Sequence, residues 1–224
     1  MPSPEETNGE HPSAAIEADA TGGADEATRQ PISTVVIIIA MQTEALPLVS
    51  KFQLSEDTDG ILFPKGVPWV RYHGKYKDLN INLVWPGKDL LLGVDSVGTV
   101  SASLVTYASI QALKPDLVIN AGTAGGFKLG RLSTGDSLDM SPYDEGAILA
   151  NDAVIKDMEG AAVAYVADLL SVPAIFIKAV TDIIDGEKPT AEEFLQNLVA
   201  VTANLDQAVT QAIYFINGRC LSDL

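Results

Sequence analysis

Three carboxylates, Glu44, Glu159 and Asp182, are the residues of this chain best placed to do chemistry. Glu44 follows an apolar run at residues 35–40. Asp182 ends the apolar run that begins at Pro173, and Glu159 opens an alanine-rich segment. Because ligands of open α/β sheets bind beyond the carboxyl ends of the strands, the three side chains could meet at one rim. A group of carboxylates can protonate a leaving group and stabilise a positive charge that develops beside it.

Each carboxylate also has a structural interpretation. Glu44 could answer the dipole of a helix that starts beside it, and Asp182 could cap the turn that follows. Glu159 is harder to explain in this way, because an acid at the start of an apolar helix needs polar partners. The glycine-rich stretch at residues 122–126 matches neither a Walker loop nor a dinucleotide fingerprint. It could be a plain tight turn, or it could let backbone amides approach a ligand.

Composition excludes several classes of site and partner. One cysteine, Cys220, excludes an intramolecular disulfide and a Cys-based zinc site, and two histidines, His11 and His73, leave little room for histidine chemistry. The 224 residues carry 14 Lys plus Arg against 30 Asp plus Glu, for a net charge of −16. This charge argues against a nucleic-acid or anionic-membrane partner, because phosphate groups are bound by clustered Lys and Arg.

The first 30 residues differ in composition from the rest. They carry seven acids and one base, and Ile16 is their only large aliphatic residue after Met1, so we predict a disordered acidic tail at residues 1–30. The tail has no apolar core of a secretory signal, and its acidity argues against a transit peptide. The longest strongly apolar run, residues 35–41, is too short to cross a bilayer. We therefore expect a soluble cytoplasmic protein with one folded domain at residues 31–224.

Strands and helices alternate along this domain, which predicts an α/β fold around a mixed, mostly parallel sheet. Continuous β-branched runs such as residues 35–40 indicate strands that are buried on both faces. The predicted strands are residues 35–40, 69–72 and 80–85 (a pair turning at Gly74-Lys75), 117–121, 131–133 and 173–180. The predicted helices are residues 44–52, 99–113, 157–170 and a last one that begins with a capping box at Thr190 and Glu193 and ends at Asn217-Gly218.

One connection is unusually short. Only nine residues separate the strand that ends at Ala121 from the strand that begins at Arg131. A crossover between parallel strands needs about a dozen residues or more. Either these two strands do not pair in parallel, or a segment that usually lies between them is absent.

Five motifs, taken together and in order, resemble those of the 5′-methylthioadenosine nucleosidase family, and the plant enzymes most closely. They are residues 40–44 (AMQTE), 120–126 (NAGTAGG), 133–136 (STGD), 157–160 (DMEG) and 179–182 (AVTD). The resemblance implies a nucleoside-phosphorylase-like three-layer fold, a homodimer and no cofactor. It also implies cleavage of the N-glycosidic bond of 5′-methylthioadenosine, and in some members S-adenosylhomocysteine, to release adenine in methionine salvage.

The same resemblance implies roles for individual residues. Asp182 would protonate adenine N7, Glu44 would position and deprotonate the attacking water, and Glu159 would hold the ribose hydroxyls. The remaining implied contacts are Met158 beside the sugar, Thr123 near the nucleophile, Thr181 near the acid, and Leu138 and Asp139 along the purine. Carboxylates without histidine suit this chemistry, because the adenine must be protonated while anions stabilise an oxocarbenium-like ribosyl group.

Compared with the family, the chain is shortened after Lys128, where a long segment with central sheet structure, pocket residues and dimer surface would follow. This shortening leaves a second functional hypothesis open, in which the chain is an impaired variant that binds or stores nucleosides without turnover. A third hypothesis is that the chain is a phosphorylase. Phosphorylases of this fold hold phosphate with arginines, and none of the four arginines (Arg29, Arg71, Arg131 and Arg219) lies in the five motifs.

Overall fold

The computed structural model describes residues 29–126, 130–138, 141–182 and 190–224, with the backbone alone at residues 182, 190–194 and 196. Its strands form one mixed sheet in the order β2-β3-β4-β1-β5-β7-β6, and β8 pairs with β5. The β1–β4, β1–β5, β5–β8 and β6–β7 pairs are parallel, as expected for a mostly parallel sheet. The strands are β1 (Thr34–Ile38), β2 (Ser55–Glu56), β3 (Val70–Tyr76), β4 (Leu79–Trp85), β5 (Leu117–Gly126), β6 (Arg131–Thr134), β7 (Ala153–Asp157) and β8 (Ala174–Asp182).

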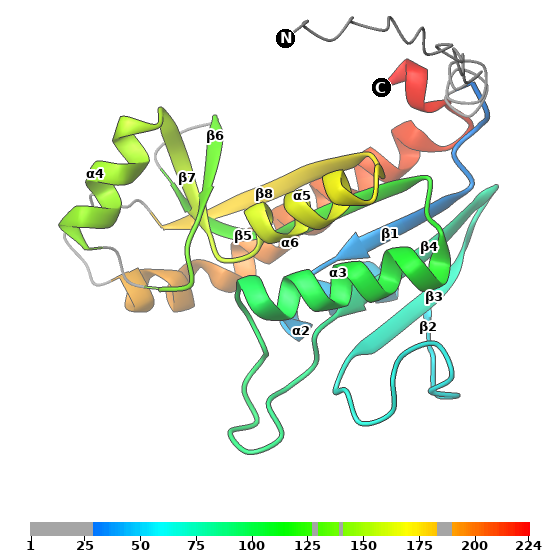
Figure 1. Cartoon of the computed structure of the whole chain (residues 1–224), viewed down its shortest axis with the longest axis horizontal. Helices are drawn as coiled ribbons and strands as arrows, with labels where there is room; N and C mark the ends of the chain where they lie inside the picture. Colours follow the sequence, from blue (N-terminus) through cyan, green and yellow to red (C-terminus); the bar gives the residue numbers. More distant parts are fainter. Residues whose placement is uncertain (1–28, 127–129, 139–140, 183–189) are drawn as a thin grey trace, which may run out of the picture.

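Helices cover both faces of the sheet, which gives the predicted three layers (Figure 1). The α-helices are α2 (Gln42–Lys51), α3 (Thr99–Leu113), α4 (Pro142–Ala150), α5 (Gly160–Leu169) and α6 (Thr190–Ile216). One apolar cluster joins the sheet to α2 and α6, and a second joins it to α3 and α5. The aliphatic side chains of β1 are fully buried because this strand lies between both layers. No helix in the described ranges is long and apolar enough to cross a membrane.

Two local predictions are wrong, and the tight turn that the sequence left open at residues 122–126 is not formed. The hairpin between β3 and β4 turns at Lys77-Asp78 rather than at Gly74-Lys75. Residues 122–126 do not form a turn but continue β5 as a strand. Asp157 ends β7, and the helix predicted from this residue begins only at Gly160. The sequence patterns also gave no sign of β7 or of α4. The predicted capping box at Thr190 and Glu193 lies outside the described side chains, as does most of the acidic tail.

The short connection joins two strands that are not neighbours. β7 lies between them, antiparallel to β5 at Gly125 and Gly126 and parallel to β6. Of the two alternatives left open by the sequence, the first therefore holds, since β5 and β6 do not pair. Together β6, β7 and α4 form an outlying unit at the end of β5 (Figure 1).

β8 carries apolar side chains that this architecture covers incompletely. Phe176 and Val180 point to the same face, because residues two apart in a strand share a face. They are 38% and 39% exposed, whereas Val118 on the neighbouring strand is fully buried. This face of β8 is therefore apolar surface that the described helices leave partly uncovered.

Candidate functional site

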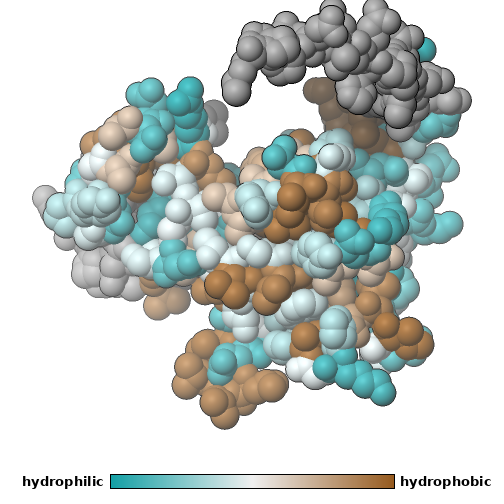
Figure 2. All heavy atoms as spheres, viewed as in Figure 1, coloured by the Kyte–Doolittle hydropathy of each residue, from teal (hydrophilic) through white to brown (hydrophobic). Residues whose placement is uncertain are grey.

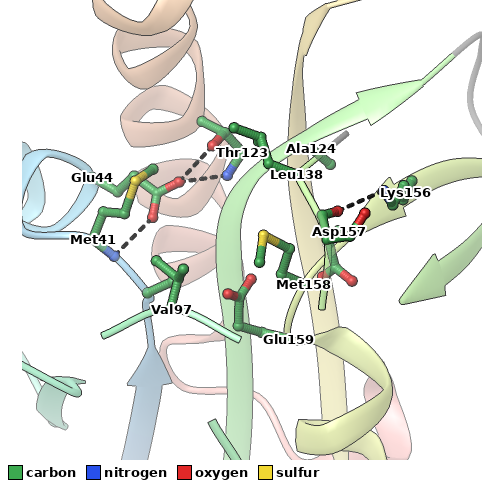
Figure 3. A pocket seen from close by; sticks show the side chains of 12 residues that line it. Met41, Glu44, Val97, Thr123, Ala124, Leu138, Lys156, Asp157, Met158 and Glu159 are labelled. Carbon is green, nitrogen blue, oxygen red and sulfur yellow. Dashed lines mark hydrogen bonds between the residues drawn. The ribbon is translucent and has the colours of Figure 1, made fainter. Parts of the chain in front are cut away.

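A cavity of about 250 Å³ opens where β1, β5 and β7 end (Figure 3). Side chains from the β1–α2 junction, β5, the β7–α5 junction and the segment before α3 meet there. The lining residues are Ala40, Met41, Glu44, Val97, Thr123, Ala124, Ser137, Leu138, Lys156, Asp157, Met158 and Glu159. The cavity is close to the lower end of the range of about 300–1,000 Å³ that is typical of small-molecule sites.

Glu44 lies in the first turn of α2, with only 2% of its surface exposed. One oxygen, Oε1, accepts hydrogen bonds from the backbone N–H (2.7 Å) and the hydroxyl (2.8 Å) of Thr123, and Oε2 accepts one from the N–H of Met41 (3.2 Å). Burial raises the pKa of the Glu44 carboxyl, while these hydrogen bonds and the charge of Lys178 act against the rise. The hydrogen bond from Met41 places the Glu44 carboxylate at the start of α2, which is the structural role that the sequence suggested for it. The hydrogen bonds from Thr123 hold the same carboxylate at the cavity wall.

Glu159 approaches the same cavity from the end of β7, just before α5 (Figure 3). It is 7% exposed, and its Oε1 accepts a 2.8 Å hydrogen bond from the N–H of Gly98. Burial raises the pKa of Glu159 to about 7, with Lys178 opposing the rise and Asp157 and Glu44 adding to it. Its charge therefore changes near neutral pH, and its second oxygen remains available to a ligand.

Lys178 and Asp157 form an ion pair that the sequence analysis did not assign. Lys178 Nζ lies 2.7 Å from Asp157 Oδ2, and the two side chains are 5% and 0% exposed. Asp157 also accepts hydrogen bonds from the hydroxyl of Thr134 (2.6 Å) and the N–H of Gly160 (2.9 Å). The sequence contained one indication of this ion pair. Lys178 is the single lysine inside the apolar run of β8, and a buried charge needs a partner of opposite charge.

The structure brings together five of the eight predicted site residues. Glu44, Thr123, Leu138, Met158 and Glu159 all line the cavity. Thr181 lies behind it, where its hydroxyl donates a 3.4 Å hydrogen bond to the carbonyl of Ala124.

The other two predicted site residues are less fully described. The backbone of Asp182 pairs with Gly125 at the end of β8, and its side chain lies outside the described atoms. Asp139 lies outside the described residues altogether. Over the residues that are described, no cluster of three His, Cys, Asp or Glu side chains is arranged to hold a metal ion.

The pattern of the family described as "Phosphorylase superfamily" matches residues 34–138 and 127–214. The chain is 57% identical to 5′-methylthioadenosine nucleosidase of Arabidopsis thaliana, over 87% of this chain and 91% of that protein. It is 53% identical to 5′-methylthioadenosine/S-adenosylhomocysteine nucleosidase of the same plant, over 88% of this chain and 96% of that protein.

Solved structures agree with these similarities. The apo structure of the Arabidopsis thaliana 5′-methylthioadenosine nucleosidase superposes with a TM-score of 0.85, covering 87% of this chain and all of that chain, at 57% identity. Futalosine hydrolase of Helicobacter pylori has a TM-score of 0.66 at 17% identity, covering 81% of this chain and 97% of that chain. At that identity the second similarity shows the shared fold alone.

The alignment also shows that the chain is shorter than its relatives. The 57% identity extends over 245 aligned positions, yet 87% of this 224-residue chain is only about 195 residues. About 50 positions of the relative therefore have no counterpart here. The two segments of the family match overlap at residues 127–138, so the family pattern restarts around the connection between β5 and β6, and the missing positions belong there. Both alternatives that the sequence left open are therefore true. β5 and β6 do not pair, and a segment that the relative carries between them is absent here.

Proposed function

The chain belongs to the 5′-methylthioadenosine nucleosidase family of the phosphorylase superfamily, and we propose that it hydrolyses 5′-methylthioadenosine to adenine and 5-methylthioribose. The observation that carries this proposal is the meeting of Glu44 and Glu159 at one cavity that also holds Met158. Two buried carboxylates from distant segments supply the negative charge that a ribosyl cation requires.

In the proposed reaction, a water oxygen attacks C1′ of the ribose as the bond from C1′ to adenine N9 breaks. The electron pair of that bond goes to adenine, which takes a proton at N7 from Asp182. Glu44 accepts a proton from the attacking water, and its three hydrogen bonds to Thr123 and Met41 keep it oriented for this task. Glu159 accepts hydrogen bonds from the ribose hydroxyls and stabilises the positive charge on the sugar.

Water is the proposed nucleophile because none of the described residues that line the cavity is an arginine that could hold phosphate. Lys156 is the one cation among the lining residues, and its Nζ donates a 2.6 Å hydrogen bond to the carbonyl of Ser137. The ammonium of Lys178 behind the wall is paired with Asp157.

A homodimer is part of this proposal. The loop between β4 and α3 exposes Leu90, Leu91 and Leu92, and one side of α3 exposes Leu104 and Tyr107, all by more than half. Figure 2 shows hydrophobic atoms gathered on this loop and along α3. Apolar surface of this extent favours burial against a partner, and a two-fold axis would let one surface serve both copies. Leu91→Asp is expected to convert the dimer to a monomer in sedimentation velocity, and an unchanged sedimentation coefficient would remove this surface from the interface.

A second candidate function is nucleoside binding without turnover. It is favoured by the roughly 50 missing positions and by the partly exposed face of β8. Purified protein incubated with 5′-methylthioadenosine, and separately with S-adenosylhomocysteine, distinguishes the candidates when adenine is quantified by chromatography. Hydrolysis predicts adenine release without phosphate. A phosphate requirement would indicate phosphorolysis, and calorimetric binding without adenine release would indicate the binding protein.

A further inference from the structure

Lys178 lies among three buried carboxylates that come from three different elements. It pairs directly with Asp157 at the end of β7. A Cβ atom on Gly122 would lie 3.5 Å from both Lys178 Nζ and Glu44 Oε1, so these two charged atoms are at most about 7 Å apart. The charge of Lys178 also acts on Glu159 more strongly than any other neighbouring charge. One ammonium is therefore paired with Asp157, lies within about 7 Å of Glu44 Oε1 and acts on the charge of Glu159, two residues after Asp157.

We propose that the Asp157–Lys178 ion pair is a positioning unit, which fixes one positive charge beside Glu44 and Glu159 and thereby sets the charge state of both. The inference rests on the proposed hydrolysis, because that reaction needs the two carboxylates at one cavity. Neither Asp157 nor Lys178 takes part in the bond changes of the proposed reaction.

The need for such a unit follows from the charges. Glu44, Asp157 and Glu159 are each less than a tenth exposed, and three carboxylates in a dry region repel one another. Lys178 is the single described ammonium that acts on all three, since Lys156 is directed to the carbonyl of Ser137. Without Lys178, both Glu44 and Glu159 would hold their protons to higher pH.

The position of Lys178 is fixed through Asp157. The two carboxylate oxygens of Asp157 accept hydrogen bonds from Thr134 and Gly160 in addition to the ion pair. Thr134 is itself held, because its hydroxyl accepts a 2.8 Å hydrogen bond from the N–H of Ala161. β6 and α5 thus lock the rotamer of Asp157, and Asp157 holds the ammonium that the two other carboxylates share.

The two members of the pair have opposite electrostatic effects, which gives a sharp test. Asp157→Asn preserves the shape of the side chain but removes a negative charge beside Glu159, so the pH at which Glu159 ionises should fall. Lys178→Met removes the positive charge, so the same pH should rise. Lys178→Arg restores the charge and should return the value close to that of the unmodified chain. Asp168→Asn, an exposed change on α5, is the matched control.

The first measurement needs no substrate and no activity. The side-chain carboxyls of glutamate are labelled with ¹³C and titrated by NMR, and the Glu159 signal is identified by its loss in Glu159→Gln. Opposite displacements of its midpoint in Asp157→Asn and Lys178→Met support the proposal. Displacements in the same direction, or none in either variant, overturn it.

The second measurement is the pH profile of kcat/KM for adenine release. Asp157→Asn is expected to lower kcat by up to about 100-fold, because a misplacement of about 1 Å at a positioning group can cost that much. The acidic limb should move with the NMR midpoint in each variant. A loss of activity with an unmoved limb and a lowered melting temperature would mean a merely structural pair. If the unmodified chain releases no adenine, the proposed function fails, while the NMR titration still decides the charge arrangement.

Discussion

Replacing Glu159 by glutamine should stabilise the folded chain above pH 7 and weaken nucleoside binding at the same time. Burial raises the pKa of Glu159 from 4.5 to about 7. Between these two values the folded chain keeps a proton that the unfolded chain has released, so stability falls as the pH rises through this range and levels off above it. A difference of this size corresponds to an upper value of about 3 kcal/mol in the free energy of unfolding at pH 8.

Glutamine removes this cost without removing the local hydrogen bond, because its amide oxygen can still accept from the N–H of Gly98. The measurement is thermal and urea unfolding of both proteins at pH 5, 6, 7 and 8. At pH 5 the two should be nearly equal. At pH 8 the Glu159→Gln protein should be more stable by about 1–3 kcal/mol, which for a domain of this length corresponds to a gain of several degrees in Tm.

Glu145→Gln is the matched control, since Glu145 is exposed on α4. The control should change stability by less than about 1 kcal/mol at every pH. Parallel curves for the unmodified chain and Glu159→Gln, or a less stable variant at pH 8, would refute the reasoning from burial.

The functional half of the prediction concerns the ribose. Hydrogen bonds to a charged group contribute about 1.5–3 kcal/mol each, so Glu159→Gln should weaken binding of an adenine nucleoside by about 10–100-fold at pH 8. For the unmodified chain, affinity should rise as the pH rises through 7 and Glu159 ionises. An analogue without the 2′-hydroxyl should lose much less affinity in the variant. Equal losses for both ligands would remove Glu159 from the ribose site.

Three further predictions address the other parts of the site. Asp182→Asn should lower kcat by about 10²–10⁴-fold with little change in ligand Kd, and a near-normal kcat would exclude Asp182 as the acid. Thr123→Val removes a hydroxyl donor from Glu44, so Glu44 should ionise at higher pH and kcat/KM below pH 7 should fall further than in the unmodified chain; equal values below pH 7 would separate Glu44 from the rate. Inserting the roughly 50-residue segment of the Arabidopsis relative between Lys128 and Leu129 should raise both Tm and adenine release, and a stable, fully active unmodified dimer would contradict this expectation.

Elements with complete local signals could be predicted from the sequence. The predicted helix at residues 99–113 has the same bounds as α3, because Gly98 precedes it and Lys114-Pro115 ends it. The β-branched run of β1 likewise predicted a strand that is buried on both faces.

Glycines were the main source of error, because a sequence does not show whether a glycine serves a turn or a close contact. A Cβ on Gly74 would lie 2.9 Å from the side chain of Leu54, so this glycine makes room within β3. The turn uses Lys77 instead, with a φ of 51°. Gly126 similarly continues β5, where a Cβ would lie 3.0 Å from the carbonyl oxygen of Val154 on β7.

The ion pair of Lys178 and Asp157 could not be predicted for a different reason. A lysine in an apolar strand indicates a buried partner, but several acids lie near strand ends in this sequence. The choice of Asp157 depends on β7 pairing with β5, and β7 itself gave no recognisable local signal. Tertiary contacts thus determined the part of the site that local patterns could not.

The arrangement of the strands also limits what the missing segment can change. Glu44 and Thr123 precede the short connection, whereas Glu159 and Lys178 follow it. The connection does not hold these two halves together, because β5 and β8 pair directly along residues 118–125. The missing segment therefore affects β6, β7 and the exposed face of β8 first. It can affect Glu44 and Glu159 only indirectly, through Thr134 and Asp157. Even if the missing segment lowers the stability of the chain, Glu44 and Glu159 therefore stay at one cavity.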